Sequence, residues 1–319
     1  MVSKLSVRAS ARDLLFRDLD NFTAGKIHVH LPRWDVILQG HNKRDEILSY
    51  LKIGVDVHDF FLPLRGDFQG TYYDLAFPPS IKFSNIKSCA GVEDFINKTI
   101  LERLANRSLS IWGKVGFVSS PHLVMPLTVE PTKPRLCHDE RFLNLWIRDL
   151  PLTLDYICNL PRYVAHNHFQ STMDDKSGYD HVRLSPKSRT YFGLEWCGWY
   201  VHNRTPFDWK ASAYLYHTIG MAATSYARSL GVPCSQYIDD RHVGQLALCH
   251  RPSKPDIEWS NLEYADAAAF ILISLGFFIG LSKSSLAPRQ VNVFRIYRGL
   301  YSLCLFNPGG QEKEIRRSA

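Results

Sequence analysis

The strongest restriction on the fold comes from two adjacent carboxylates, Asp239 and Asp240, inside the stretch Gln-Tyr-Ile-Asp-Asp at residues 236–240. Neighbouring carboxylates repel each other unless water, a basic side chain or a divalent cation compensates their charge. Aspartate is also common in ordinary turns, so a solvated turn without further function remains open at this point. Apolar residues on both sides predict two short strands within residues 235–248 that flank the two aspartates.

A second predicted strand, residues 169–173, also runs into acidic residues, because Asp174 and Asp175 follow it directly. If both strands end at the same edge of one sheet, Asp174 and Asp239 meet there and form a site of hard oxygen ligands. Magnesium suits such a site, since it accepts few protein carboxylates and leaves positions for water and phosphates. Two such ions would activate an attacking 3′-hydroxyl and neutralise a leaving pyrophosphate. The two acidic strand ends therefore predict phosphoryl-transfer chemistry.

The rest of the chain alternates between helical and strand patterns, which predicts an α+β fold. Apolar residues at helical spacing predict helices over residues 44–51, 92–104, 210–230 and 257–275. Alternation predicts a strand over residues 122–130, a turn at 131–134 and a second strand through Leu136. Residues 62–84 are rich in Gly, Pro and Tyr and predict a loop.

Length and composition set wider bounds. The 319 residues indicate about two domains, with a soft boundary near residue 110. The 38 Lys and Arg exceed the 31 Asp and Glu, and the net charge of +7 favours a polyanionic partner while leaving open a basic enzyme without one. The seven cysteines form no Cys-x-x-Cys pair, which indicates an intracellular, reduced protein rather than a secreted one. The most apolar stretch, residues 267–281, is too short to span a bilayer, so we expect no membrane association.

Five short motifs follow one another between residues 110 and 300. They are Lys-Pro-Arg-Leu at 133–136 with Asp139, Arg141 and Leu143-Asn144; Asp-Asp-Lys-Ser-Gly-Tyr at 174–179; Thr-Pro-Phe-Asp-Trp-Lys-Ala-Ser-Ala at 205–213; Tyr-Ile-Asp-Asp at 237–240; and Leu-Gly-Phe at 275–277 with Lys283-Ser284 and Pro288. Each motif is modest alone, but all of them in this order are specific. The chain resembles the reverse transcriptases of retroelements, in particular those of long-terminal-repeat or tyrosine-recombinase retrotransposons.

The resemblance implies a right-hand polymerase fold, with a palm made of an antiparallel sheet backed by helices and with fingers. It divides the chain into an N-terminal extension of uncertain structure at 1–110, fingers and palm at 111–300, and a basic tail at 301–319. We therefore expect the thumb to be largely missing. A partner domain or a dimer is a possible source of thumb and ribonuclease H.

The resemblance also implies roles for individual residues in this sequence. Asp174, Asp239 and Asp240 match the catalytic and metal-binding carboxylates, and the backbone carbonyl of Asp175 matches a further metal ligand. The expected cofactor is a pair of Mg²⁺ ions, with Mn²⁺ as a possible substitute. The expected partners are an RNA or DNA template with its primer, and deoxynucleoside triphosphates. Arg141 and Tyr237 are expected to contact template and primer.

Four further residues match the nucleotide-binding positions of the family. Arg135 would grip the triphosphate through its bidentate fork, and Lys283 would lie near the phosphates. Tyr179 would exclude a 2′-hydroxyl beneath the sugar, and Phe207 would pack near the nascent base pair. Simpler alternatives remain open for three of them: Arg135 as a surface arginine, Tyr179 as a core tyrosine and Lys283 as a solvated lysine.

Three positions depart from the family pattern. Asp208 replaces a glycine that lets the backbone approach the substrate, Ala213 replaces a proline, and residues 293–297 replace the Phe-Leu-Gly of the primer-grip hairpin. The histidines His166 and His168 match no common zinc pattern.

The predicted function is an RNA-directed DNA polymerase that adds deoxynucleotides to a primer 3′-hydroxyl by two-metal nucleotidyl transfer. The alternative is a catalytically impaired retroelement relic that keeps the palm fold and only binds nucleic acid. Asp208 and the missing thumb favour the alternative, whereas the intact carboxylates oppose it. Tyr179 and the Tyr-Ile-Asp-Asp sequence argue against an RNA-dependent RNA polymerase.

Overall fold

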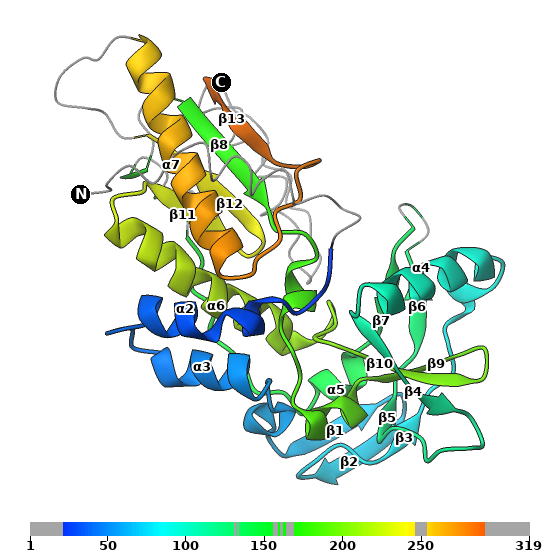
Figure 1. Ribbon diagram of the computed structural model, residues 1–319. Coiled ribbons are helices and arrows are strands. Elements are labelled where there is room, and N and C mark those ends of the chain that lie inside the picture. The colour runs from blue at the N-terminus through cyan, green and yellow to red at the C-terminus, as the bar shows by residue number, and fades with distance from the viewer. Residues whose placement is uncertain are drawn as a thin grey trace, which may run out of the picture.

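The computed structural model describes residues 22–130, 132, 134–155, 159, 162–163, 169–245 and 254–290. The chain folds into two halves, which appear at the top left and the bottom right of Figure 1. Helices and largely antiparallel sheets make up both halves, so the fold is α+β. Of the helices that fall within the described part of the chain, none is both long and apolar enough to cross a membrane.

The first half contains a four-stranded antiparallel sheet with the strand order β11-β12-β8-β13. The strands are β8 (Phe169–Asp174), β11 (Cys234–Tyr237), β12 (Asp240–Val243) and β13 (Ser285–Gln290). Two long helices, α6 (Lys210–Ser229) and α7 (Lys254–Ser274), pack against this sheet (Figure 1). Helix α6 carries buried residues at helical spacing, which form the face that packs against the sheet. The helix ends before Gly231, which has a positive φ, and the chain then enters β11.

The second half contains a five-stranded mixed sheet with the order β3-β5-β9-β10-β4, together with two hairpins and short helices. The sheet is built from β3 (Ile81–Lys82), β4 (Leu109–Lys114), β5 (Leu123–Val124), β9 (Gly193–Trp196) and β10 (Trp199–Asn203). The hairpins are β1 (Leu64–Phe68) with β2 (Thr71–Leu75), and β6 (Leu127–Val129) with β7 (Leu136–His138). The helices of this half are α4 (Glu93–Ala105), α5 (Arg141–Asn144) and the 3₁₀ turns η4 (Lys87–Cys89) and η7 (Pro186–Tyr191), whereas η6 (Gly178–His181) follows β8 and contacts α6.

The segment before residue 110 contributes to the cores of both halves. It begins with η2 (Ile27–His30), α2 (Leu31–Ile37), α3 (Arg44–Lys52) and η3 (Val57–Phe60). The fully buried Trp34 donates its indole N–H to the carbonyl oxygens of Ile27 and Leu275, each at 3.1 Å, and so joins α2 to the end of α7. On the other side, Ile96 and Ile100 of α4 lie in a core cluster with Leu136. The boundary near residue 110 stays a prediction.

Most predicted elements are confirmed in position, with two corrections. The helices predicted at 44–51, 92–104, 210–230 and 257–275 correspond to α3, α4, α6 and α7. The loop predicted over residues 62–84 is wrong, because β1 and β2 form a hairpin whose turn has positive φ at Gln69 and Gly70. The single strand predicted over 122–130 is divided into β5 and β6 at Met125-Pro126. His166, His168 and residues 293–319 lie outside the described residues.

Candidate active site

The palm-like sheet brings the two acidic strand ends together. Asp240 at the start of β12 is paired across the ladder with Asp174 at the end of β8. Asp239 precedes Asp240 in the β11–β12 turn, and its carbonyl oxygen accepts a hydrogen bond from the Asp175 N–H at 3.0 Å. The expectation that the strand ends meet at one edge of a sheet is therefore confirmed, while the roles of the three carboxylates stay predictions.

The turn that carries Asp239 is held in an unusual backbone conformation. Ile238 has φ +55°, a region that β-branched residues rarely adopt. Its carbonyl oxygen accepts a hydrogen bond from the Gln236 side-chain amide at 2.7 Å. A Cβ atom at Gly220 in α6 would lie 2.2 Å from the Gln236 amide nitrogen, so only glycine leaves room for this contact. Helix α6 thus helps to fix the turn.

Asp175 turns its side chain away from Asp174 and into the core. Its carboxylate accepts hydrogen bonds from the Tyr216 hydroxyl and from Arg241 Nε, the latter at 2.9 Å. Asp175, Tyr216 and Arg241 are all buried, and the Arg241 guanidinium also lies 4.9 Å from the centre of the Phe277 ring. Because strand neighbours face opposite sides, only the Asp175 backbone is available to the candidate site, which is the part that the sequence analysis assigned to it.

Burial raises the pKa of each of the three carboxylates of the site, and the negative charges of neighbouring aspartates add to this effect. Desolvation, together with the negative charges of Asp239 and Asp174, raises the pKa of Asp240 to about 6. Desolvation and the charge of Asp174 also raise the pKa of Asp239. Desolvation raises the pKa of Asp174, and Lys283 opposes this rise from a distance of 3.5 Å between its Nζ and Asp174 Oδ1. The sheet edge therefore concentrates negative charge that one exposed lysine offsets only in part.

This donor set fits Mg²⁺ when a substrate completes it. Among the described residues, no three His, Cys, Asp or Glu side chains form a ready-made metal centre. Magnesium, however, is commonly held by one or two carboxylates together with substrate phosphates and water. Asp174 and Asp239 can supply the two carboxylates, and the raised pKa of Asp240 marks the excess negative charge that a cation would relieve.

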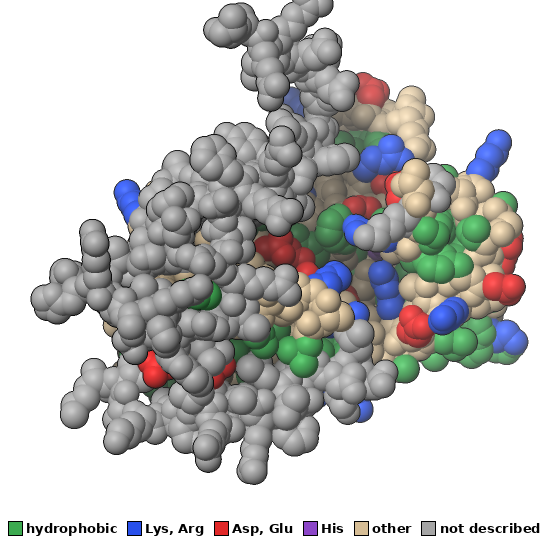
Figure 2. Space-filling view, turned by 90° about the horizontal axis from the view of Figure 1, so that it is seen from above, with side chains coloured by type: hydrophobic (Ala, Val, Ile, Leu, Met, Phe, Trp, Pro, Cys, Tyr) green, Lys and Arg blue, Asp and Glu red, His purple; other side chains and the backbone are tan. Residues whose placement is uncertain are grey.

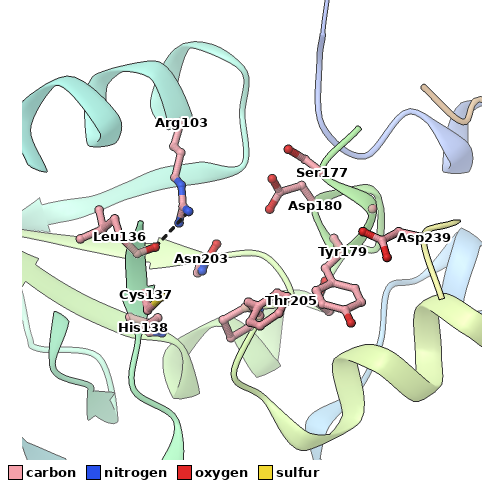
Figure 3. Close-up of a pocket in the computed structure, with 13 residues that line it drawn as sticks. Arg103, Leu136, Cys137, His138, Ser177, Tyr179, Asp180, Asn203, Thr205 and Asp239 are labelled. Atoms are coloured by element: carbon pink, nitrogen blue, oxygen red, sulfur yellow. Dashed lines mark hydrogen bonds between the residues drawn. The ribbon is translucent and has the colours of Figure 1, made fainter. Parts of the chain in front are cut away.

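A cavity of about 190 Å³ opens beside the carboxylates, between the two halves of the chain. Ser177, Tyr179, Asp180 and Asp239 line it from the palm side, and Arg103 with Leu136–His138 lines it from the other side (Figure 3). Figure 2 shows acidic and basic side chains around the hollow at the centre of the molecule. The cavity could take a nucleotide next to Asp239.

Tyr179 and Phe207 lie together at this cavity. Their ring centroids are 5.5 Å apart, and Tyr179 also packs edge-on against the buried Tyr216 at 5.8 Å. Thr205 donates a hydrogen bond to the Tyr179 carbonyl oxygen, which fixes the backbone at this point. Phe207 is 70% exposed, so its ring is available for contact with a ligand. The two aromatic residues singled out in the sequence, Tyr179 for the sugar and Phe207 for the nascent base pair, thus both lie on the wall of the cavity, and their roles stay predictions.

The predicted phosphate and template residues are more scattered. Arg135 is exposed and does not line the cavity. Arg141 is engaged with Asp139 through contacts of 2.9 Å at Nε and 2.7 Å at Nη2, which leaves it 70% exposed but paired. Tyr237 lies opposite Asp240 in the hairpin. Lys283 alone among the predicted cations reaches a carboxylate of the site.

The departure at Asp208 does not intrude on the cavity. Its backbone carbonyl accepts a hydrogen bond from the Asn144 amide at 2.7 Å, and its side chain is absent from the cavity lining. Desolvation and the nearby Asp139 raise the pKa of the Asp208 carboxyl. The charge of Asp208 therefore interacts with Asp139, His138 and Arg141 from a position outside the cavity lining.

Sequence reasoning missed three residues that line the cavity. Arg103 projects from α4 and donates a hydrogen bond to the Leu136 carbonyl at 3.2 Å (Figure 3). Asp180 and the buried Asn203 face the same space, and desolvation raises the pKa of Asp180 to about 6. Asp180 directly follows Tyr179 in the motif and could have been suspected, whereas Arg103 lies in a segment to which no motif pointed.

Solved structures share this fold. A foamy viral protease-reverse transcriptase dRH in complex with double-stranded DNA matches with a TM-score of 0.52 and 17% identity, over 81% of this chain and 44% of that chain. The foamy viral enzyme in complex with an RNA/DNA hybrid matches with a TM-score of 0.51 and 16% identity, over 89% of this chain and 34% of that chain. A second complex with double-stranded DNA gives 0.51 and 16%, over 80% of this chain and 52% of that chain.

The chain has a reverse-transcriptase-like palm fold. No protein-family model and no curated protein matches the sequence. At this level of identity the likeness shows the fold alone. The chain spans about half or less of the length of these reverse transcriptases.

Proposed function

We propose that this reverse-transcriptase-like chain is an RNA-directed DNA polymerase that extends a primer 3′-hydroxyl with deoxynucleotides. The observation that carries the proposal is the pairing of Asp240 with Asp174, which gathers three carboxylates at the edge of a palm-like sheet next to a cavity. Phosphoryl transfer depends mainly on positioning and charge neutralisation, so such a cluster can suffice without a nucleophilic side chain.

In this proposal Asp174 and Asp239 hold two Mg²⁺ ions, or Mn²⁺ in their place, and Asp240 adds negative charge beside them. The bound ions would supply neutralisation of the triphosphate and a lowered pKa of the primer hydroxyl. Lys283, at 3.5 Å from Asp174, would exchange its carboxylate contact for a phosphate contact when a nucleotide binds. The backbone of Asp175 is fixed by its hydrogen bond to Asp239 and keeps the two strand ends in register.

Tyr179 and Phe207 would contact the sugar and base of the incoming nucleotide. The position of Tyr179, wedged between Phe207 and Tyr216, supports a rigid ring that excludes a 2′-hydroxyl. Replacing Tyr179 by valine is therefore expected to admit ribonucleotides at least 10-fold more readily, whereas phenylalanine keeps the selection. Arg135 and Arg141, both on the opposite half, would reach triphosphate and template respectively once nucleic acid is bound.

The decisive experiment is primer extension by the purified chain on RNA and DNA templates with Mg²⁺ and deoxynucleotides. Asp239→Asn is expected to abolish extension while the fold is kept. Asp67→Asn serves as the matched control, because Asp67 is an exposed carboxylate on β1, outside the cavity lining, and should change nothing. Extension that survives in Asp239→Asn would refute the assignment of the carboxylates.

A chain that folds and binds primer–template but never extends it would support the alternative, a catalytically impaired relic that only binds nucleic acid. In that case Asp208→Gly tests whether the departure at this position is responsible.

We further propose that the chain derives from a retrotransposon and acts inside the cell. The free thiols of Cys89, Cys137, Cys197 and Cys234 agree with a reducing compartment. A partner domain or a second copy would supply thumb and ribonuclease H functions.

A further inference from the structure

A second cavity, of about 350 Å³, lies on the other side of Asn203, the residue that lines both cavities. Its walls carry five basic side chains that are far apart in the sequence: Lys26, Arg107, Arg183, Arg189 and Arg204. His28 and His202 also line it, and its lining contains no Asp or Glu residue. We call this cavity the arginine pocket.

The five cations of the arginine pocket form no close ion pair with a described carboxylate. In the part of the chain that the structure describes, none of their side-chain nitrogens lies within 4.0 Å of an Asp or Glu oxygen, whereas arginines elsewhere, such as Arg44 and Arg228, form ion pairs. Like charges that are gathered and partly buried without compensation are costly, unless an anion from solution completes the site. The charge of Asp180, which lines the first cavity, offsets part of the positive charge at Arg204. The arginine pocket therefore keeps an excess of positive charge that the described part of the chain compensates only in part.

Two of the arginines are fixed in place by the backbone. Arg183 donates a hydrogen bond to the Leu51 carbonyl at 2.9 Å, and Arg204 Nε donates to the Arg107 carbonyl at 2.6 Å. A Cβ atom at Gly25 would lie 2.2 Å from Arg204 Nη1, so this glycine, which has φ +70°, allows the N-terminal segment to pass directly over the guanidinium. These contacts order the two side chains before any ligand arrives.

Burial and the positive charges of the arginine pocket lower the pKa values of several basic groups that line it. Burial and the charges of Arg183 and Arg204 lower the pKa of His28 to about 4, and burial together with Arg189 and Arg204 lowers the pKa of His202. Burial and Arg183 lower the pKa of Arg204 itself to about 10, against the opposing charge of Asp180. Three buried atoms on the wall, Nδ1 of His28, Nε of Arg183 and Oδ1 of Asn203, have no hydrogen-bond partner.

We infer that the arginine pocket binds phosphate groups, either of a free polyphosphate or of a nucleic-acid backbone. Guanidinium groups pair with phosphate oxygens through two parallel hydrogen bonds, which lysine and histidine cannot do. Five cations around one cavity exceed what a single monoanion needs and match a ligand with several phosphate charges. The inference does not depend on the proposed polymerase activity, because none of the five cations lines the first cavity and Asn203 alone is shared.

The test separates the fixed arginines from those that only face the cavity. No side-chain hydrogen bond joins Arg107 or Arg189 to any other described residue, so Arg107→Gln with Arg189→Gln should leave the fold intact. The control is Arg65→Gln with Lys98→Gln, which removes the same two charges from exposed sites outside the pocket. If the double pocket variant fails to fold, Arg189→Gln alone replaces it.

Inorganic tripolyphosphate without added metal is the first probe, measured by calorimetry and by thermal shift. The wild-type chain is expected to gain about 5 °C in Tm at ligand concentrations near 100 times Kd. The pocket variant is expected to bind at least 10-fold more weakly, and the control variant is expected to bind like the wild type. Equal affinity in the pocket and control variants would overturn the inference.

A fluorescent single-stranded oligonucleotide is the second probe and identifies the source of the phosphates. If the ligand is a nucleic-acid backbone, the pocket variant loses affinity for the oligonucleotide, and the magnitude of the slope of log K against log salt falls by about 1.4, since each phosphate contact with a single strand contributes about 0.7. If the ligand is a free polyphosphate, only tripolyphosphate binding changes. A wild-type chain that is folded and binds neither probe at 1 mM would also overturn the inference.

Discussion

Asp174 and Asp175 are neighbours in sequence, yet the fold uses their carboxylates in opposite ways. Asp175 is buried against Arg241 and Tyr216, so a permanent cation compensates its charge. Asp174 faces the sheet edge, where Asp239 and Asp240 add negative charge and only the exposed Lys283 lies close. The two-residue period of the strand thus places one carboxylate in a buried ion pair and its neighbour at the edge of the sheet.

The buried Asp175–Arg241 pair is also connected to the turn that carries Asp239. Arg241 Nη1 donates to the Gln236 side-chain oxygen and to the Thr224 hydroxyl, each at 3.0 Å. Gln236 in turn donates to the Ile238 carbonyl in the turn that presents Asp239. A continuous buried network therefore runs from Asp175 to the turn, and breaking it should affect both stability and the geometry of the site.

Removal of one partner of the buried pair should have the largest effect on stability. Arg241→Met leaves Asp175 buried without its cation, and we expect a loss of about 3–5 kcal/mol in the free energy of unfolding. The double variant Asp175→Leu with Arg241→Met removes both charges and should recover most of this loss. Urea denaturation followed by circular dichroism measures both values.

The double variant separates the contribution of the network to stability from its contribution to the geometry of the site. If it is stable but inactive in primer extension, the network acts through the position of the turn. A single variant Arg241→Met that is as stable as the wild type would show that the pair does not carry the compensation described above.

Gly220→Ala should have the next largest effect, because it attacks the same network from α6. In a helix interior this replacement normally stabilises by about 1 kcal/mol. Here the new Cβ would lie 2.2 Å from the Gln236 amide, so we expect a loss of about 1–3 kcal/mol instead. Gly66→Ala, whose nearest neighbouring atom would be 3.7 Å away, is the matched control and should be close to neutral. A thermal melt of the two variants decides the sign.

The sequence predicted the palm-like sheet well because its signals are local. The apolar runs that end in Asp174 and Asp239 identify β8 and β11, and the helical spacing of α6 ends at Gly231 as expected. The expected meeting of the two acidic strand ends at one edge is confirmed, whereas the register that pairs Asp240 with Asp174 comes from the structure. These parts depend on neighbouring residues and on one simple geometric rule.

The remainder depends on contacts between distant segments, which no local pattern encodes. Trp34 is fixed by the Leu275 carbonyl, and Arg103 reaches the cavity from a helix with no recognisable motif. The inward turn of the Asp175 side chain could be anticipated from strand periodicity, but its partner Arg241 could not be chosen from several nearby basic residues. The arginine pocket draws its cations from positions between 26 and 204, so the sequence alone gave no sign of it.

Asp240→Asn removes one of the carboxylates at the sheet edge that no buried cation compensates. This variant should be more stable than the wild type at neutral pH. The pKa of Asp240 is raised to about 6 in the folded chain from an ordinary value near 3.8, so its ionisation opposes folding. With allowance for solvent screening, the gain should be about 1 kcal/mol above pH 6 in the absence of metal. It should decline between pH 6 and pH 4 and vanish below pH 4, where aspartate is protonated in both states.

Thermal melts from pH 4 to pH 8 in the presence of a chelator measure this dependence, with Asp67→Asn as the exposed control. Added Mg²⁺ should stabilise the wild type more than Asp240→Asn. A variant that is less stable than the wild type at pH 7.5 in chelator would mean that Asp240 is already compensated within the fold.

The smallest effect is expected at Ile238, whose φ of +55° stores strain in the β11–β12 turn directly before Asp239. Ile238→Gly and Ile238→Ala both remove the side chain that packs against the core, so their difference isolates the backbone. At an ordinary φ alanine is the more stable choice, because glycine has more freedom in the unfolded chain. At a positive φ the Cβ of alanine costs about 1–2 kcal/mol, so the glycine variant should exceed the alanine variant by about 0.5 kcal/mol. Chemical denaturation of the two variants measures the difference. If alanine is the more stable, the turn relaxes to a negative φ, and the Gln236 contact, rather than backbone strain, is what presents Asp239 beside Asp174.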